Sequence, residues 1–581
     1  MANTPLEISK KCGQDDVAKS IGHYWSTWNM QRNPKVEEWK ELRNYIFATD
    51  TSTTSNSSLP WKNKTTIPKL CQIRDNLHSN YISALFPNDE WLRWEGYSVS
   101  DSVKEKKKAI EAYMSNKCRM GDFRQRMSQL LLDFIDYGNA FGTVDFEASY
   151  REGTNGEVIT AFLGPKARRI SPLDIVFNPL AESFEASPKI VRSIVTYGEL
   201  ETMAADQPDN QYLRDALKRR KKIMSRPGAY GIEDANKYEA FQVDGFGSYM
   251  EYLNSGYVEL LTFYGDLYDA DEGKLLRGHR IVVIDRMWMI ECAPLPQWLG
   301  GAPVYHVGWR TRPDNLWAMG PLDNLVGMQY RIDHLENLKA DAMDLAVMPP
   351  LVVAGDVEAF EWKPGAEIHI DEGGTVTELG RNAQWVIQAE NAIIALEQRM
   401  EMYAGAPREA MGIRTAGEKT AFEVQQLQNA AGRIFQEKIT HFETQLMEKI
   451  LNAMLETSVR NLDTKDVVRA IDNDIGAQVF LEITKDDITA NGVLRPIGAR
   501  HFAAQAQMMQ NLQGVFNSPI GQMISPHVSS KALATLVEDM IGIGRFEIIK
   551  PFIQVEEQQE LQEYMNTAQE SQIEQEQLPP V

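Results

Sequence analysis

The chain has 581 residues, which exceeds one ordinary hydrophobic core, so we expect two or more domains. Apolar residues make up 43% and charged residues 24% of the sequence, a balance typical of globular rather than disordered proteins. The net charge of −21 disfavours a protein that holds nucleic acid tightly, because tight binding of the phosphate backbone uses an excess of Lys and Arg; brief or sliding contact with DNA stays open.

The cysteines and the hydropathy pattern predict a reducing compartment and no membrane span. The four cysteines are far apart and form no C-x-x-C pair, so no disulfide framework is implied (Cys12, Cys71, Cys118 and Cys292). The first residues lack an apolar segment, which predicts no signal peptide. Without a run of about 18 apolar residues, we expect no transmembrane helix.

The N-terminal half predicts both helices and strands. Trp25, Trp28 and Trp39 recur at helical spacings and indicate a core-facing helix over 17–48. The segment 49–60 is polar and predicts a loop. Further helices are expected over 69–86, 102–117, 120–138 and 201–240, and strands over 139–200 and 255–294.

The middle of the chain predicts two helices joined by a small β-insert. Apolar residues recur every three or four positions over 317–348 and again over 385–404. Short strands and turns are expected between them, over 349–384. The apolar stripes of these helices would be covered by side-by-side contacts in a closed ring, or by packing inside a monomer.

A loop over 405–418 and a long helix from about 419 to 461 follow. At 1.5 Å per residue this helix would be roughly 60 Å long. Gly432 lies inside it and weakens it, so we predict a kink there.

The C-terminal part predicts a strand over "AQVFLEIT" and helices at about 497–515 and 527–542. The segment 553–577 contains seven Glu and eight Gln and neither Lys nor Arg. Its few apolar residues could not bury enough surface to fold alone. It is either a flexible tail or a helix that orders only against copies of itself.

Residues 411–433 contain a near match to a phosphate-binding loop. Gly412, Gly417, Lys419 and Thr420 approximate G-x-x-x-x-G-K-[ST], but Glu418 separates the second glycine from the lysine. The extra residue turns the lysine away, and its carboxylate repels phosphate. The preceding segment also predicts a helix rather than the buried strand of a P-loop. We interpret the segment as a loop between two helices, with a nucleotide site as the alternative.

The order of these elements resembles the portal proteins, or head-to-tail connectors, of tailed bacteriophages, especially short-tailed ones. The stretches "RRISPLDIVFNP", "GPLDNLVGMQYRIDHLENLKADAM" and "TAGEKTAFEVQQ" contribute to the resemblance, which covers nearly the whole chain. It implies an α+β, mainly helical subunit that assembles as a ring. By position, the implied parts are a wing over 1–316, stem helix 1 over 317–348, a clip over 349–384, stem helix 2 over 385–404, a tunnel loop over 405–418, a long kinked helix with further wing strands over 419–496, and crown helices with the acidic tail over 497–581.

The resemblance implies a ring of twelve subunits at one capsid vertex of the virion, made in the host cytoplasm during assembly. Such a ring nucleates capsid assembly, conducts DNA during packaging and ejection, and docks first the packaging motor and then the tail. The expected partners are further copies of the chain, double-stranded DNA, the terminase large subunit, tail adaptor or nozzle proteins, and the major capsid and scaffolding proteins. No membrane, cofactor, metal or catalytic residue is expected, and the protein is not expected to be an enzyme.

Two segments are candidate functional surfaces. The clip is acidic, and a docking face for a motor or tail adaptor would use Asp356, Glu358, Glu361, Glu367, Asp371 and Glu372; a solvated surface insert is the alternative. The tunnel-loop candidates are Arg408, Arg414, Thr415 and Lys419. A modest cationic ring at a constriction would touch the DNA backbone without gripping it.

Two other classes of protein stay open. A nucleotide-dependent enzyme would use the degenerate phosphate loop, and a carboxylate nuclease could draw on the 81 acidic residues, although H-E-x-x-H and G-x-S-x-G motifs are absent from the sequence. Another virion structural protein, such as a capsid or tail-tube subunit, is the second alternative. The long predicted helices disfavour it.

Overall fold

The structure is a computed structural model. It describes residues 6–8, 14–86, 91–96, 101–152, 158–224, 257–295, 301–347, 351–355, 369, 373–378, 384–404, 436–462, 466–471, 478–489 and 492–496. The fold is mixed α+β: about half of the described residues are helical, and the strands form several small, mostly antiparallel sheets. The chain divides into two compact units, Met1–Asp89 with Cys118–Asn461 and Glu90–Lys117 with Leu462–Val581.

The largest sheet of the first unit has six strands. Five of them are antiparallel neighbours in the order β5-β6-β7-β8-β9, and β1 pairs in parallel with the end of β7, where Leu6 lies opposite Leu267. Their bounds are β1 Leu6–Ile8, β5 Ile175–Phe177, β6 Lys189–Thr196, β7 Tyr257–Asp269, β8 Lys274–Ile284 and β9 Trp288–Pro294. The strands expected over 255–294 are confirmed.

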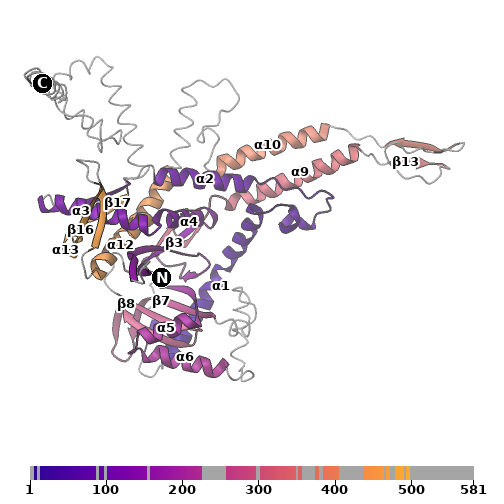
Figure 1. Cartoon of the computed structure of the whole chain (residues 1–581). Coiled ribbons are helices and arrows are strands. Elements are labelled where there is room, and N and C mark those ends of the chain that lie inside the picture. The colour runs from indigo at the N-terminus through magenta and orange to yellow at the C-terminus, as the bar shows by residue number, and fades with distance from the viewer. Residues whose placement is uncertain are drawn as a thin grey trace, which may run out of the picture. The chain divides into compact units, whose positions relative to one another are not determined.

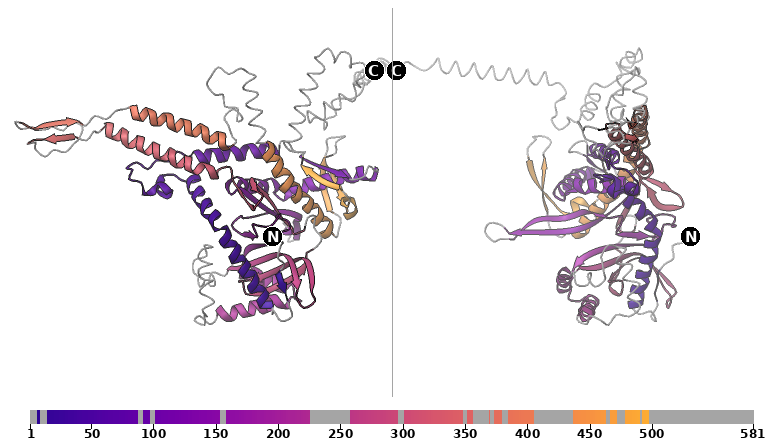
Figure 2. Two further views of the ribbon diagram at one scale, coloured as in Figure 1. Left: turned by 180° about the vertical axis from the view of Figure 1, so that it is seen from behind. Right: turned by 90° about the vertical axis from the view of Figure 1, so that its right-hand side faces the viewer.

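Helices cover both faces of this sheet (Figure 1, and from behind in Figure 2). On one face lies α1 (Gln14–Ile46), whose buried Ile21 and Trp25 pack with Leu261 and Phe263 of β7. On the other face lie α5 (Tyr197–Asp206) and α6 (Gln211–Met224), whose apolar residues pack with Val258 and Ile284. Because side chains alternate along a strand, β7 serves both cores. The predicted burial of the tryptophans is confirmed, since Trp25, Trp28 and Trp39 are each 9% exposed or less.

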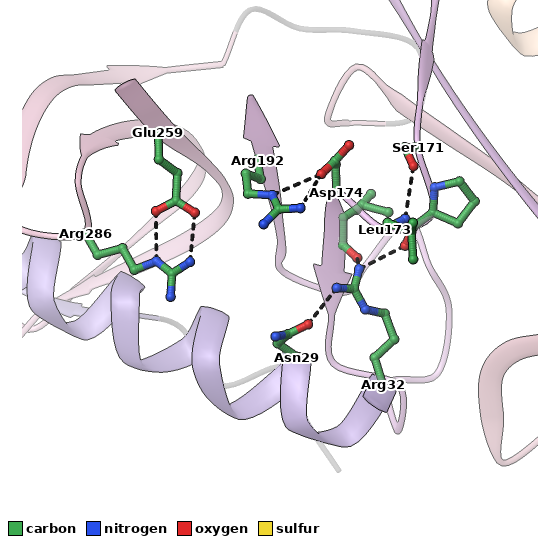
Figure 3. Close-up of polar contacts among 10 residues, drawn as sticks. Asn29, Arg32, Ser171, Leu173, Asp174, Arg192, Glu259 and Arg286 are labelled. Atoms are coloured by element: carbon green, nitrogen blue, oxygen red, sulfur yellow. Dashed lines mark hydrogen bonds and ion pairs between the residues drawn. The ribbon is translucent and has the colours of Figure 1, made fainter. Parts of the chain in front are cut away.

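Polar contacts fasten α1 to the sheet (Figure 3). Arg32 donates from Nη1 to the carbonyl oxygens of Pro172 at 2.9 Å and Ile175 at 2.7 Å, and from Nη2 to Asn29 at 2.6 Å. Nearby, Arg286 and Glu259 form two hydrogen bonds of 2.8 Å and are both buried. Because buried carbonyls and charges are costly without partners, the bonds from Arg32 to Pro172 and Ile175 hold α1 against the sheet, and the Arg286–Glu259 pair stabilises the sheet itself.

A second sheet of the first unit has the order β10-β3-β4, formed by β3 (Asn139–Glu152), β4 (Val158–Ile170) and β10 (Val304–Gly308). Next to it lie α4 (Phe123–Asp136), α12 (Glu448–Asn461) and the hairpin of β11 (Arg310–Arg312) with β12 (Asn315–Met319), and α2 (Lys69–Leu85) packs on α4. Aromatic side chains fill the core here: Phe141 packs against Phe177, Phe184 and Trp317. The polar segment 49–60 contains two short 3₁₀ turns, η1 (Thr51–Thr53) and η2 (Ser55–Ser58).

Two long helices follow, joined by a hairpin. After η3 (Asp323–Leu325), α9 spans Val326–Val347, the strands β13 (Leu351–Ala354) and β14 (Thr375–Glu378) pair antiparallel, and α10 spans Gln384–Ala404. Figure 1 shows α9 and α10 side by side with β13 at their far end. We call α9, β13, β14 and α10 the two-helix arm. The predicted helix over 385–404 is confirmed, as are short strands within 349–384.

The predicted start of the first arm helix at 317 is wrong. Residues 315–319 form strand β12, and the helix begins at Val326. Trp317 and Ala318 are buried, and Gly320 packs against the backbone of Gly138. This close contact leaves no room for a helical turn at Gly320. The apolar spacing of this segment therefore reflects a buried strand followed by a 3₁₀ turn.

The described part of the long helix contains a different irregularity from the predicted one. Residues 436–442 are α-helical, η4 (Glu443–Met447) is a π-helical turn, and α12 continues over Glu448–Asn461. Gly432 and the predicted kink lie outside the described residues. The π turn places Leu446 and Met447 in the core, where both are fully buried.

The second unit contains most of α3 (Asp101–Met120) and two strand pairs. β2 (Leu92–Gly96) pairs antiparallel with β17 (Gly492–Pro496), and β15 (Asp466–Ile471) with β16 (Gln478–Ile483); α13 (Lys485–Ile488) precedes β17. The predicted strand "AQVFLEIT" corresponds to β16. The helices expected at 497–515 and 527–542 lie outside the described residues, as do the acidic tail and Cys12. Cys71, Cys118 and Cys292 are free thiols.

Candidate functional site

The inner half of α9 buries a row of polar side chains. Gln329, Asp333 and Asn337 are each 0% exposed and follow one another at four-residue spacing, which places them on one helix face. Asn337 accepts a hydrogen bond from the backbone N–H of Thr65 at 2.7 Å and donates to the Thr65 carbonyl at 2.9 Å. A single side-chain amide thus satisfies both backbone groups of one residue.

The same pattern continues one turn toward the N-terminus of α9. Asp333 Oδ1 accepts from the N–H of Ile67 at 3.2 Å, and Gln329 Nε2 donates to the Ile67 carbonyl at 2.6 Å. Gln329 Oε1 also accepts from the N–H of Leu70 at 3.2 Å. Because the segment before α2 would otherwise bury unpaired backbone groups, these side chains replace the neighbouring strand that it lacks. We call Gln329, Asp333, Asn337 and Asp341 the polar ladder.

Asp341 is the outermost member of the ladder. Its carboxylate accepts from the N–H groups of Lys62 at 3.1 Å and Asn63 at 2.9 Å. Slight burial alone would raise the pKa of Asp341, but these hydrogen bonds outweigh burial and lower it. At Asp333 the balance is reversed, because burial raises the pKa of its carboxyl to about 7. The second oxygen of Asp333 is buried without a hydrogen-bond partner.

Two ion pairs attach α10 to its neighbours. Lys69, the first residue of α2, lies 2.6 Å from Glu401 near the end of α10, and both side chains are buried. Lys339 of α9 lies 2.7 Å from Glu390 of α10 at the surface. α10 is therefore joined to α2 at its inner end and to α9 in its first half.

Large apolar side chains on α10 remain uncovered in the single chain. Its buried face carries Ile393, Met400 and Ala404. Trp385 and Tyr403 lie about five turns apart, on one flank of that face, and are 71% and 60% exposed. Ile387 and Ile394 lie about two turns apart, on the opposite flank, and are 63% and 42% exposed. Further exposed apolar residues of the two-helix arm are Leu338, Met343, Val347, Val352, Val353 and Met402.

None of the side chains proposed from the sequence can be placed by this structure. The clip acids Asp356, Glu358, Glu361, Glu367, Asp371 and Glu372 lie outside the described residues, between β13 and β14 in the chain. The tunnel-loop residues Arg408, Arg414, Thr415 and Lys419 also lie outside them. What the structure does place are the two helices and the two strands that flank these segments.

Sequence reasoning missed the polar ladder. The apolar line predicted the buried face of the first arm helix, and this holds for Leu322, Leu325 and Ile332. Farther along α9 the buried residue is Asn337, whereas Leu338 is 45% exposed. A signal was present in the spacing of Gln329, Asp333, Asn337 and Asp341, but four polar residues at helical spacing ordinarily mark a solvent-facing stripe.

Two other features were sought among the described residues: metal sites and membrane-spanning helices. There, no group of three or more His, Cys, Asp or Glu side chains is arranged to hold a metal ion. Among the same residues, no helix combines the length and apolar character needed to cross a bilayer. Comparison of the sequence with protein-family models and with curated proteins gives no match.

Proposed function

We propose that this chain is the subunit of a phage portal ring, with the two-helix arm as its stem and the β13–β14 hairpin as the base of its clip. The order of two helices around a small β-insert, followed by a long helix, supports this proposal. In this role the ring sits at one capsid vertex, nucleates capsid assembly and conducts double-stranded DNA during packaging and ejection. It docks the terminase motor and afterwards the tail adaptor proteins.

The observation that carries the proposal is the pair of exposed apolar flanks on α10. A two-fold dimer brings one self-complementary patch of each subunit together, and one patch suffices for it. A closed ring uses two different patches on every subunit, one for each neighbour. Trp385 and Tyr403 on one flank, with Ile387 and Ile394 on the other, provide two separate apolar patches on one helix. We infer that a further copy of the chain covers each flank.

The charge of the chain fits a conduit. At −21 per subunit, a ring of such chains would present DNA with a largely repulsive surface. Weak attraction to the phosphate backbone favours sliding over binding, because each neutralised phosphate adds affinity.

The first test is native mass spectrometry of the purified full-length chain, accompanied by negative-stain electron microscopy. A closed ring of about a dozen subunits of 65.8 kDa with a central hole is the expected result. A monomer or dimer at every salt concentration would contradict the proposal and favour an enzyme or another interaction protein. A flat shell or a stacked tube would favour another virion structural protein.

Flank variants test the geometry of the ring. A first variant carries Trp385→Ser and Tyr403→Ser, and a second carries Ile387→Ser and Ile394→Ser. Each alone should fail to close a ring, because one of its two patches is lost. An equimolar mixture should form a heterodimer through the two intact patches and stop there. Tyr150→Ser is the matched control, since Tyr150 is 64% exposed on β3. This variant should still assemble into the closed oligomeric ring. Self-dimers of either flank variant would point to a two-fold interface instead.

The tunnel loop needs a separate functional test. Neutralising Arg408, Arg414 and Lys419 with glutamine should alter DNA packaging or retention while the ring stays intact. Unchanged packaging and retention would remove these residues from the proposed DNA path.

A further inference from the structure

A cationic cleft lies in the first unit. It has a volume of about 670 Å³ and is lined by residues from α1, α2, α4, β3 and β4, together with Phe47 and Tyr137. Six of its lining residues are basic: Arg43, Arg74, Arg126, Lys166, Arg168 and Arg169. Only Asp133, Asp136 and Glu147 oppose them in the lining. Just outside the lining, Asp145 pairs with Arg168 at 3.1 Å and Asp75 with Arg74 at 3.3 Å, so the basic lining residues without an ion pair in the described part of the chain are Arg43 and Arg126.

Buried carboxylates hold two of these arginines in place. Arg74 donates from Nε and Nη2 to the two oxygens of Asp136, at 2.6 and 2.8 Å. Arg169 donates in the same way to Asp133, at 2.5 and 2.7 Å. Such two-pronged pairs set the orientation of the guanidinium plane, and each leaves further N–H groups for another acceptor.

Arg43 and Arg126 differ from these pairs. Arg43 contacts the Tyr137 hydroxyl at 3.4 Å, and Arg126 donates to Gln129 at 3.0 Å. Neither forms an ion pair with a carboxylate of the described residues, and Arg126 Nε is buried without a hydrogen-bond partner. Arg43 and Arg126 both line the cleft, and an oxyanion bound there would give their guanidinium groups the negatively charged acceptor that these hydrogen bonds lack.

An exposed aromatic ring lies beside these cations. Phe47 lines the cleft and is 59% exposed, and the Arg74 guanidinium lies over its ring at 5.4 Å from the centroid. An exposed aromatic ring next to positive charge is the combination on which nucleobases stack in proteins that bind nucleic acid without sequence preference. The volume lies within the range that encloses a ligand of nucleotide size.

We propose that this cleft binds a nucleotide unit, with Arg43 and Arg126 contacting its phosphate and Phe47 stacking on its base. The unit could come from a free nucleotide or from a nucleic-acid strand, since both present the same phosphate and base. The inference is independent of the proposed ring, because the cleft is formed within one chain.

The test measures fluorescence anisotropy with the full chain and two probes, a fluorescent ATP analogue and a labelled ten-nucleotide single-stranded DNA. The key variant is Arg43→Gln with Arg126→Gln. The charge-matched control is Arg310→Gln with Arg312→Gln, two exposed arginines on β11. We expect the key variant to lose about tenfold or more in affinity and the control to change little. For DNA the salt dependence should also weaken, by about 0.7 in log–log slope for the one phosphate contact that is lost.

Phe47→Leu separates stacking from charge. It should weaken binding of either probe about fivefold or more, and it should leave the salt dependence unchanged. Circular dichroism and thermal unfolding confirm that each variant is folded.

The probes distinguish the source of the nucleotide. Binding of the ATP analogue alone supports a free nucleotide, and binding of DNA supports a strand. Failure of both probes to bind would overturn the proposal. Equal losses in the key and control variants would also overturn it, because they would show a diffuse charge effect. The proposal would also be overturned if a synthetic acidic peptide of residues 553–577 binds and neither nucleotide probe does.

Discussion

Lys69 and Glu401 form a buried ion pair, with Lys69 Nζ at 2.6 Å from Glu401 Oε1 and both side chains 7% exposed or less. The pair joins the first residue of α2 to the last turn of α10, across more than half of the chain. It lies where the polar ladder ends, so α2, α9 and α10 meet at one polar junction at the inner end of the two-helix arm.

Removing the charge of Glu401 should destabilise this junction. In Glu401→Gln, Lys69 stays buried while its nearest carboxylate is lost, with only Glu397 at 4.0 Å remaining. We expect a loss of about 2–3 kcal/mol, because an uncompensated buried charge is costly. Glu390→Gln is the matched control: its pair with Lys339 is at the surface and should contribute less than about 1 kcal/mol. Thermal unfolding of both variants measures the difference, and equal melting temperatures would contradict the expected ranking.

The polar ladder should stabilise the folded conformation of the segment before α2. Asn337→Leu leaves the N–H and carbonyl of Thr65 without their partner; these groups are partly buried, and the loss should cost at most about 1–3 kcal/mol for each. Hydrogen–deuterium exchange of residues 62–70 should therefore become at least about tenfold faster. Asp344→Ala, which removes one exposed hydrogen bond from Asn63, should change it little. If both variants exchange alike, the ladder does not hold the segment.

Asp333 should make this segment depend on pH. Burial raises the pKa of its carboxyl to about 7, against about 3.9 in an unfolded chain. Between these values the folded state binds the proton more tightly than the unfolded state does. Stability is therefore greatest below about pH 4 and falls as pH rises through 7.

Exchange protection at Ile67, corrected for the intrinsic rate, should accordingly be lower at pH 8 than at pH 5.5. The difference should be on the order of 2 kcal/mol. Asp333→Asn keeps the oxygen that accepts from Ile67 and should remove the pH dependence. A dependence that persists in this variant would assign it to another group.

Gly138 should tolerate no side chain. Its φ is +67°, and a Cβ there would lie 2.3 Å from the backbone nitrogen of Gly320. Gly138→Ala should therefore cost more than about 3 kcal/mol, through backbone strain and the clash together. Gly198→Ala is the control, because Gly198 lies in α5 with open space around it and alanine favours a helix. A melting temperature for Gly138→Ala at or above that of the control would show that the two backbones can separate freely.

Local periodicity was sufficient to predict most elements of this protein. The spacing of Trp25 and Trp39 predicted α1 and its buried face, and the recurrence of apolar residues over 385–404 predicted α10 within one residue at its start. Short strands and turns were predicted between the arm helices over 349–384, where the structure has the antiparallel pair β13–β14. These features depend on neighbours within a few residues, which periodicity reports directly.

The candidate surfaces could not be predicted in the same way. The cleft takes Arg43, Arg74, Arg126 and Arg169 from elements that are widely separated in the sequence, and no spacing within any one of them indicates a site. The flanks of α10 became recognisable only when Ile393 and Met400 were found to be buried and Trp385 and Ile387 to be exposed.

The sequence by itself determined most of the helices and strands and their order, because backbone conformation follows largely from local side-chain pattern. Only the tertiary structure decided which face of α9 is buried. On α9 the partner is the backbone of residues 62–67, whose N–H and carbonyl groups have no neighbouring strand in the described part of the chain beyond the isolated Asp50–Thr65 bridge. Burying them against leucine would leave hydrogen bonds unmade, so Gln329, Asp333 and Asn337 face inward and Leu338 faces out.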